Sequence, residues 1–163
     1  MNTKTVLLQL FQEFIWWGIT AAICVAVLYP ITSKMDYQYV VLNSFFIVIG
    51  ITSLRYFLFF NSLFFLQNVW VRFGIFVTNL ILWMVVINKY ESMFQVLDIF
   101  DTSQLGKPLV FLSISAQTEL MKYIYQEILL SGLCALIGLV FLNLRIVGSY
   151  WRVAKIRFTA RMQ

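Results

Sequence analysis

RYFLFFNSLFFLQNVWVR, residues 55–72, is an apolar and aromatic run closed at each end by an arginine. Seven of the sixteen residues between Arg55 and Arg72 are aromatic. Aromatic rings and arginines gather where a membrane meets water, whereas a soluble domain rarely exposes so continuous an apolar run. The side of a membrane on which Arg55 and Arg72 lie therefore sets the topology of the rest of the chain.

The composition places the whole chain in a membrane. Of its 163 residues, 61% are hydrophobic and 12% are charged, against about 25% charged residues in an average soluble domain. The length suits a single domain, residues 1–163. We predict an integral, multi-pass membrane protein.

Charged residues mark the ends of the apolar runs. Asp36 and Arg55 enclose 18 uncharged residues, which as a helix would measure roughly 27 Å, close to the thickness of the hydrocarbon core. The same spacing recurs along the chain and predicts an all-α bundle of four transmembrane helices. The expected spans are residues 10–30, 39–60, 70–88 and 125–144.

The character of the chain changes after the third span. From Glu91 to Thr102, apolar and polar residues alternate with helical spacing, which predicts an amphipathic helix in the non-cytoplasmic loop between spans 3 and 4. The tripeptide Gly106-Lys107-Pro108 that follows is typical of a turn.

Basic residues are distributed unequally between the two sides of the predicted bundle. One side holds both termini, the 55–72 connection and eight basic residues against Glu13 alone: Lys4, Arg55, Arg72, Arg145, Arg152, Lys155, Arg157 and Arg161. Cytoplasmic loops carry the excess of Lys and Arg. We therefore expect both termini in the cytoplasm, residues 145–163 as a basic cytoplasmic tail, and a plasma or bacterial inner membrane as the location.

Small residues suggest how the helices pack. Close backbone contact drives helix association in lipid, so small residues mark interfaces. They recur at helical spacing in spans 1 and 4: Gly18, Ala22, Ala26, Ser131, Ala135 and Gly138. We predict that spans 1 and 4 pack against each other.

The residues that most chemistry requires are scarce. The chain contains no histidine, and Cys24 and Cys134 belong to no CxxC motif. No serine or cysteine has an evident base nearby, and no span holds a pair of carboxylates. We expect no catalytic residue, no cofactor and no metal.

The basic and amide side chains of the predicted cytoplasmic side are candidates for contact with anionic lipid or with a protein partner: Arg55, Asn61, Asn68, Arg72, Arg145, Arg152, Lys155, Arg157 and Arg161. If span 2 continues as a helix to Leu66 and beyond, the two asparagines and Arg72 share one polar stripe. The alternative is an aromatic belt with snorkelling arginines around a connection that folds back at the interface. We do not expect nucleic-acid binding, because no binding module accompanies the basic tail.

Three ionisable or polar residues outside that set could act within the bundle. Glu13 lies on the same side as Arg55, so an ion pair is plausible, with a proton or cation site as the alternative. Asn79, near the middle of span 3, and Asn43, nearer the outer end of span 2, are typical of hydrogen bonds between helices.

The leading functional hypothesis is a non-enzymatic subunit or scaffold of a larger membrane assembly, with membrane lipids and a protein partner or a second copy of the chain as its contacts. The alternative is a transporter or a homo-oligomeric channel whose path is lined by four polar residues: Glu13, Arg55, Arg72 and Asn79. A weaker alternative is a lipid-modifying membrane enzyme that uses Asp98 and Glu127.

Overall fold

Four long helices make up the fold. The computed structural model describes residues 3–60, 68–98, 106–108 and 112–161. The helices are α1 (Thr3–Thr32), α2 (Val40–Leu58), α3 (Val69–Asp98) and α5 (Ile114–Arg161). Each is long and apolar enough to cross a membrane by length and composition. The prediction of an all-helical chain with four such helices is confirmed.

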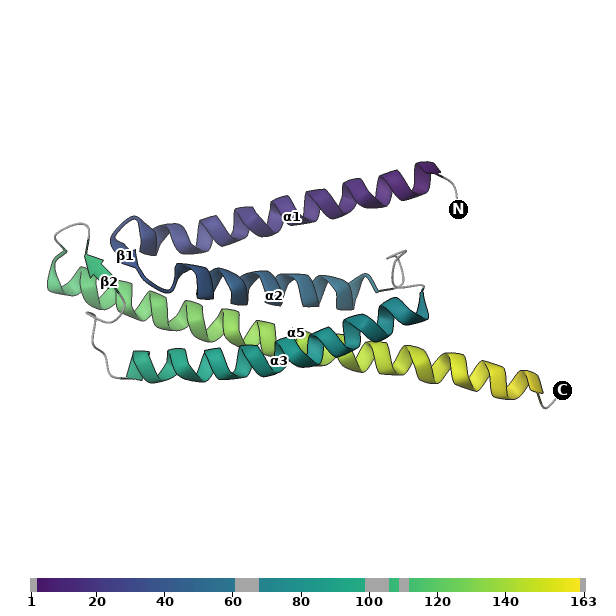
Figure 1. The fold of residues 1–163 in the computed structure, drawn as a ribbon. Helices are drawn as coiled ribbons and strands as arrows, with labels where there is room; N and C mark the ends of the chain where they lie inside the picture. The colour runs from purple at the N-terminus through teal and green to yellow at the C-terminus, as the bar shows by residue number, and fades with distance from the viewer. Residues whose placement is uncertain (1–2, 61–67, 99–105, 109–111, 162–163) are drawn as a thin grey trace.

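A short antiparallel ribbon lies at one end of the helices (Figure 1). Strand β1 (Met35–Tyr37) pairs with β2 (Gly106–Pro108), with Asp36 opposite Lys107. Both chain termini lie at the opposite end (Figure 1). We call these two ends the ribbon end and the terminal end.

Residues 106–108 were expected to form a turn, but they form strand β2. Gly106 has φ of +144°, and a Cβ at this position would overlap the carbonyl group of Asp36 on β1. Glycine is therefore required here by the close approach of the two strands as well as by the backbone conformation. The glycine that predicted a turn is instead the first residue of strand β2.

Helix α5 is the wall against which α2 and α3 both pack. Helix α1 packs on α2 and β1 and also contacts α5, where the Tyr123 hydroxyl donates to the Val27 carbonyl. The predicted packing of spans 1 and 4 through their small residues is not formed. A Cβ on Gly18 would have no neighbour within 4 Å, and Ala22 and Ala26 are exposed. The small residues of α1 thus face away from the bundle.

The small residues of α5 lie against α2 instead. A Cβ on Gly50 of α2 would lie 3.3 Å from the backbone nitrogen of Ala135, and a Cβ on Gly138 would overlap Oγ of Ser53. Ala135 is fully buried. Glycines on both partners let the backbones of α2 and α5 approach closely, as small residues do between membrane helices.

On the terminal side, the end of α2 and the start of α3 lie within two residues of the predicted span limits. Helix α2 ends at Leu58, and α3 begins at Val69 with Oδ1 of Asn68 accepting a hydrogen bond of 2.9 Å from the Trp70 amide. Asn68 therefore caps the start of a new helix. The polar stripe on one continuous helix is not formed, and Asn61 lies outside the described residues.

The expected amphipathic segment begins as a continuation of α3. The helix runs without a break to Asp98, with Met93 and Leu97 buried and Glu91 and Gln95 exposed. The remainder of that predicted helix, to Thr102, lies outside the described residues. The first two turns of the expected amphipathic helix, residues 91–98, are therefore the last two turns of α3.

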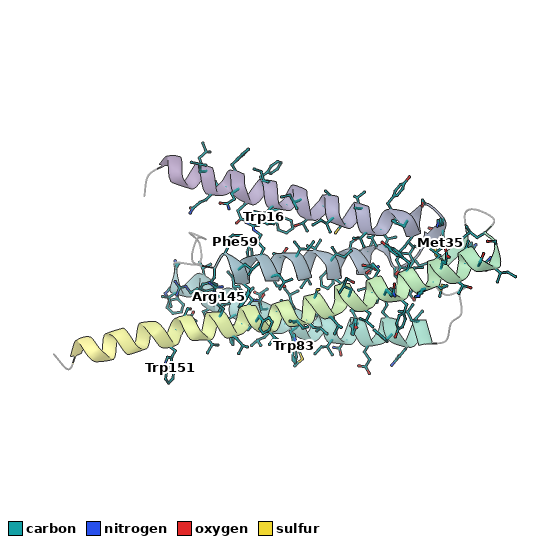
Figure 2. All side chains as sticks on the ribbon, turned by 180° about the vertical axis from the view of Figure 1, so that it is seen from behind. Trp16, Met35, Phe59, Trp83, Arg145 and Trp151 are labelled. Atoms are coloured by element: carbon teal, nitrogen blue, oxygen red, sulfur yellow. The ribbon has the colours of Figure 1, made fainter. Side chains whose placement is uncertain are left out.

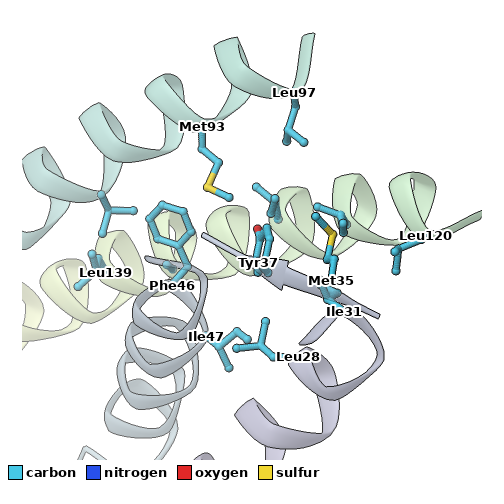
Figure 3. Packing of buried hydrophobic residues seen from close by; sticks show 14 residues of the cluster. Leu28, Ile31, Met35, Tyr37, Phe46, Ile47, Met93, Leu97, Leu120 and Leu139 are labelled. Carbon is cyan, nitrogen blue, oxygen red and sulfur yellow. The ribbon is translucent and has the colours of Figure 1, made fainter. Parts of the chain in front are cut away.

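The main hydrophobic core lies toward the ribbon end, where side chains from all four helices and β1 converge (Figure 3). Tyr37 and Met35 of β1 are buried among them. A smaller cluster at the terminal end consists of Phe60, Leu142 and Ile146. The bundle thus contains two separate clusters of buried apolar side chains.

Candidate functional site

Arg55 is buried at the terminal end and is paired with Glu13. Its side chain is 7% exposed, and its Nη2 lies 2.5 Å from Oε1 of Glu13. The guanidinium also lies over the rings of Trp16 and Tyr56, at 5.3 and 5.4 Å from their centroids. The predicted ion pair is confirmed. It joins α1 to α2, two helices that splay apart toward this end (Figure 1).

Aromatic rings surround this ion pair. Trp16 of α1 points toward α2, and its ring centroid lies 5.9 Å from that of Phe59 (Figure 2). Trp151, further along the terminal end, points away from the bundle (Figure 2). The nearby rings shield the guanidinium from water, which strengthens its attraction to the carboxylate.

Two further arginines meet on a single ring. Arg72 of α3 and Arg145 of α5 lie over Phe60, with guanidinium carbons 5.7 and 5.5 Å from the ring centroid. Arg72 donates a hydrogen bond of 3.4 Å to Oγ of Ser149. Phe60 is buried, so the end of α2, the start of α3 and the middle of α5 are joined here by cation–π contacts.

Arg145 also satisfies the end of helix α2. Its Nη1 donates to the backbone carbonyl of Phe57, and its guanidinium lies 5.2 Å from the Phe57 ring centroid. The last four carbonyls of a helix have no partner within it, and a cation there also interacts favourably with the helix dipole. Arg145 was predicted to contact anionic lipid or a protein partner, and its capping of α2 was not predicted.

The remaining predicted contact residues are placed as follows. The backbone of residues 152–161 continues α5 as a helix, so Arg152, Lys155, Arg157 and Arg161 follow the fourth span without a break. The described part of the structure contains the backbone but not the side chains of these four residues. Their contacts stay a prediction.

An open groove runs between α2 and α3, with α5 as its floor. Its volume is about 550 Å³, and its walls are almost entirely apolar. Residues from four helices line it, among them Trp17, Thr52, Tyr56, Gly74, Asn79 and Leu139. Of the four residues expected to line a transport path, Asn79 alone is among the residues that line the groove.

Asn79 is one of several polar residues that line this groove, together with Thr52, Ser53, Tyr56 and Thr78. Its side chain is 6% exposed, and its Nδ2 has no hydrogen-bond partner among the described residues. Thr78 directly precedes Asn79, and Gly74 lies one turn before Thr78; both also line the groove, and a Cβ on Gly74 would meet nothing within 4 Å. The face of α3 that borders the groove thus combines small residues with an unpaired amide.

A second polar cluster lies inside the core near the ribbon end. Nδ2 of Asn43 on α2 donates to Oε2 of Glu127 on α5, and Oγ of Ser131 lies 3.3 Å from Oδ1 of Asn43, to which it donates. Asn43 is fully buried and Glu127 is 8% exposed. The hydrogen bond between helices that was expected of Asn43 is confirmed, whereas its partner was not predicted.

Two oxygens of this cluster remain unsatisfied. Oε1 of Glu127 and the hydroxyl of Tyr37 are buried and have no hydrogen-bond partner among the described residues. Burial raises the pKa of the Tyr37 phenol, and the nearby Glu127 carboxyl raises it further, so this hydroxyl stays protonated. The position of Glu127 near the start of the predicted fourth span, residues 125–144, did not indicate that its side chain is buried against α2.

The described residues contain no group of three histidine, cysteine, aspartate or glutamate side chains that could hold a metal ion. Cys24 and Cys134 are free thiols. The geometry therefore presents a basic aromatic cluster, an open groove with one amide, and a buried carboxyl. Comparisons with models of protein families, with curated proteins and with solved structures find no match for this chain.

Proposed function

We propose that this protein is a non-enzymatic subunit or scaffold of a larger membrane assembly, and that the groove between α2 and α3 seats a transmembrane helix of its partner. The observation that carries the proposal is the Nδ2 group of Asn79, which is buried in the groove without a hydrogen-bond partner among the described residues. Both termini face the cytoplasm in this proposal, in accord with the excess of basic residues on that side.

The amide distinguishes a protein occupant from a lipid chain. An unsatisfied polar group in hydrocarbon costs several kcal/mol, and an acyl chain offers no acceptor at the depth of Asn79. A neighbouring helix offers side-chain oxygens or backbone carbonyls. The amides and hydroxyls of Asn, Gln, Ser and Thr side chains form such hydrogen bonds between neighbouring membrane helices.

Gly74 and Thr78 support the same occupant. Their spacing of four residues places two small side chains on successive turns of α3, both lining the groove. Pairs of small residues at this spacing allow two membrane helices to approach closely. A partner helix could therefore bring its backbone to the wall of α3, and the Asn79 amide, which is covered by protein atoms, would turn toward the groove to donate to it.

Site-specific photocrosslinking tests this proposal in native membranes. A photoreactive phenylalanine at Thr78 should crosslink one defined partner, and the crosslink should be lost on Asn79→Leu. The matched control is the same probe at Ile81, which is exposed and does not line the groove. A crosslink that persists unchanged in Asn79→Leu, or one that forms only to lipid, would contradict a helix in the groove. Crosslinking to a second copy would identify the partner as the chain itself.

We also propose that the terminal end binds anionic lipid. Arg72 and Arg145 are already held in place by Phe60, Ser149 and the Phe57 carbonyl, so little side-chain freedom is lost on binding a phosphate. Each basic residue near an anionic surface adds about 1 kcal/mol. This surface lies beyond the groove, so lipid and partner helix need not compete.

Native mass spectrometry from mixed detergent and lipid tests the lipid proposal. Wild-type protein should retain phosphatidylglycerol in preference to phosphatidylcholine, and Arg72→Gln should reduce that preference several-fold. Lys107→Gln, an exposed change at the ribbon end, is the control and should leave the preference unchanged. Equal retention of the two lipids by wild-type protein would overturn the proposal.

A further inference from the structure

The buried carboxyl of Glu127 has no basic neighbour. The titratable groups that face it come from three elements: Cys24 on α1, Tyr37 on β1 and Tyr123 on α5. A thiol and two phenols are neutral at ordinary pH. Glu127 forms no ion pair with a Lys or Arg among the described residues, and Arg55 is paired with Glu13 instead.

A carboxylate in this position requires a counter-charge. The free energy of burying an unpaired ionised carboxylate is so unfavourable that such groups are neutralised instead. Glu127 lies well inside α5, so neither terminus of that helix can supply a partial positive charge. The hydrogen bond from the Asn43 amide stabilises one carboxyl oxygen and leaves the other, Oε1, without a partner among the described residues.

The atoms around Glu127 suit a small cation. Four side-chain oxygens come from three elements of the fold: Oε1 of Glu127, Oδ1 of Asn43, Oγ of Ser131 and the hydroxyl of Tyr37. Two of them, on Glu127 and Tyr37, lack any partner among the described residues. Hard oxygen atoms of this kind bind a hard cation, and the carboxyl oxygen can equally hold a proton.

The site is close to the ribbon end. Tyr123 lies one helical turn before Glu127 and is 37% exposed, with its hydroxyl donating to the Val27 carbonyl. Tyr37 belongs to the ribbon itself.

We propose that Glu127, Asn43, Ser131 and Tyr37 form a binding site for one monovalent cation, a proton or a sodium ion, that exchanges with the solution at the ribbon end. The site neutralises the carboxyl of α5 and so lets α2 and α5 pack closely in the core. It is separate from the groove and does not depend on the partner proposed above.

Carbodiimide labelling tests the site directly. Dicyclohexylcarbodiimide reacts with protonated carboxyls in apolar surroundings: the carboxyl oxygen adds to the central carbon and the proton moves to one nitrogen. The acyl group then shifts from oxygen to the other nitrogen, which leaves a urea carbonyl and a stable N-acylurea. Mass spectrometry of purified protein in mild detergent should find this adduct on Glu127. Its rate should fall at least several-fold as the pH rises.

Labelling in the presence of sodium chloride distinguishes a bound sodium ion from a bound proton. If sodium binds, sodium chloride should slow the labelling, whereas choline chloride at the same ionic strength should not. If labelling responds to pH alone, the cation is the proton. Both results support the site. Absence of an adduct on Glu127, or labelling that changes with neither pH nor sodium while the protein stays folded, would overturn it.

Matched variants distinguish binding from a structural role. Glu127→Gln keeps the acceptor for Asn43 and should lose the adduct entirely. Glu119, on the same helix and exposed, should acquire no adduct, because water competes for the reagent. Tyr37→Phe keeps the buried ring and should shift the pH midpoint of labelling, which a purely structural hydroxyl would leave in place.

Discussion

Arg55 is held by contacts on several sides, and those contacts explain how a charge can lie at the end of an apolar helix. The carboxylate of Glu13 neutralises it, and the rings of Trp16 and Tyr56 cover its faces. One nitrogen, Nε, is buried without a partner among the described residues. The residue is therefore a structural tie between α1 and α2, made at the end where these helices diverge.

Removing one member of this pair should cost more than removing both. Arg55→Met leaves the Glu13 carboxylate beside apolar rings, and we expect a loss of up to about 3 kcal/mol in the free energy of unfolding. The double variant Glu13→Gln, Arg55→Met should recover most of that loss. Reversible unfolding in mixed detergent and dodecyl sulfate measures both. Strictly additive effects of the two single changes would show that the pair is not coupled.

The Glu13–Arg55 ion pair and the Asn43–Glu127 hydrogen bond differ in how far the sequence alone could predict them. Glu13 and Arg55 could be matched because few acids share the basic side of the chain. The partner of Asn43 could not be found in the same way, since it depends on which face of α5 meets α2. Side-chain pairing across 84 residues of sequence requires the helix packing to be known first.

At the level of elements, α5 is the common wall of the bundle. It spans 48 residues, roughly 70 Å at the usual helical rise, so it extends well past the partners that pack on it. Small residues marked its packing face in the sequence, but a small residue does not identify the helix that will fill the space beside it. Gly50, a single glycine in α2, proved to be the nearer match.

A leucine at Gly50 should destabilise the bundle, whereas one at Gly18 should not. The added side chain at Gly50 meets the backbone of α5, which cannot rotate away, and overpacking of this kind costs about 1–3 kcal/mol. Gly18→Leu enters open space and should change stability by less than about 0.5 kcal/mol. Thermal unfolding in detergent, followed by tryptophan fluorescence, compares the two.

One outcome would contradict the expected difference between the Gly50 and Gly18 variants. If Gly18→Leu lowered the melting temperature as much as Gly50→Leu, α1 would pack through its small residues on another helix of the same molecule. Ala22→Leu belongs with Gly18→Leu, because Ala22 is also exposed.

At the scale of the whole molecule, the number of long apolar helices followed from charge spacing alone. Charges bounded each apolar run, and those boundaries fall near the ends of α2 and the start of α3. The ribbon was not predicted, because three-residue strands carry too little pattern to separate from a turn. The groove was not predicted either, since it depends on how closely α2 and α3 approach each other along α5, which requires the helix packing to be known.

Thiol accessibility tests the orientation. In a background of Cys24→Ser and Cys134→Ser, a membrane-impermeant maleimide applied to intact cells should label Lys107→Cys at the ribbon end. Gln163→Cys should be labelled only after permeabilisation, because basic residues favour the cytoplasmic side. The reverse pattern would invert the proposed topology, and labelling of both without permeabilisation would place the ribbon end and the carboxyl terminus on one side.

The ribbon also bears on the order in which the chain is assembled. Met35 pairs with Pro108, and the whole of α2 and α3 lies between them in the chain. Strands so distant in sequence meet late, because the intervening chain must first be ordered. During synthesis, β1 would wait without a partner until α3 had returned the chain to its side. The ladder can therefore close only on a correctly threaded helical hairpin of α2 and α3, and α5, which follows β2 in the chain, is the last helix to be added.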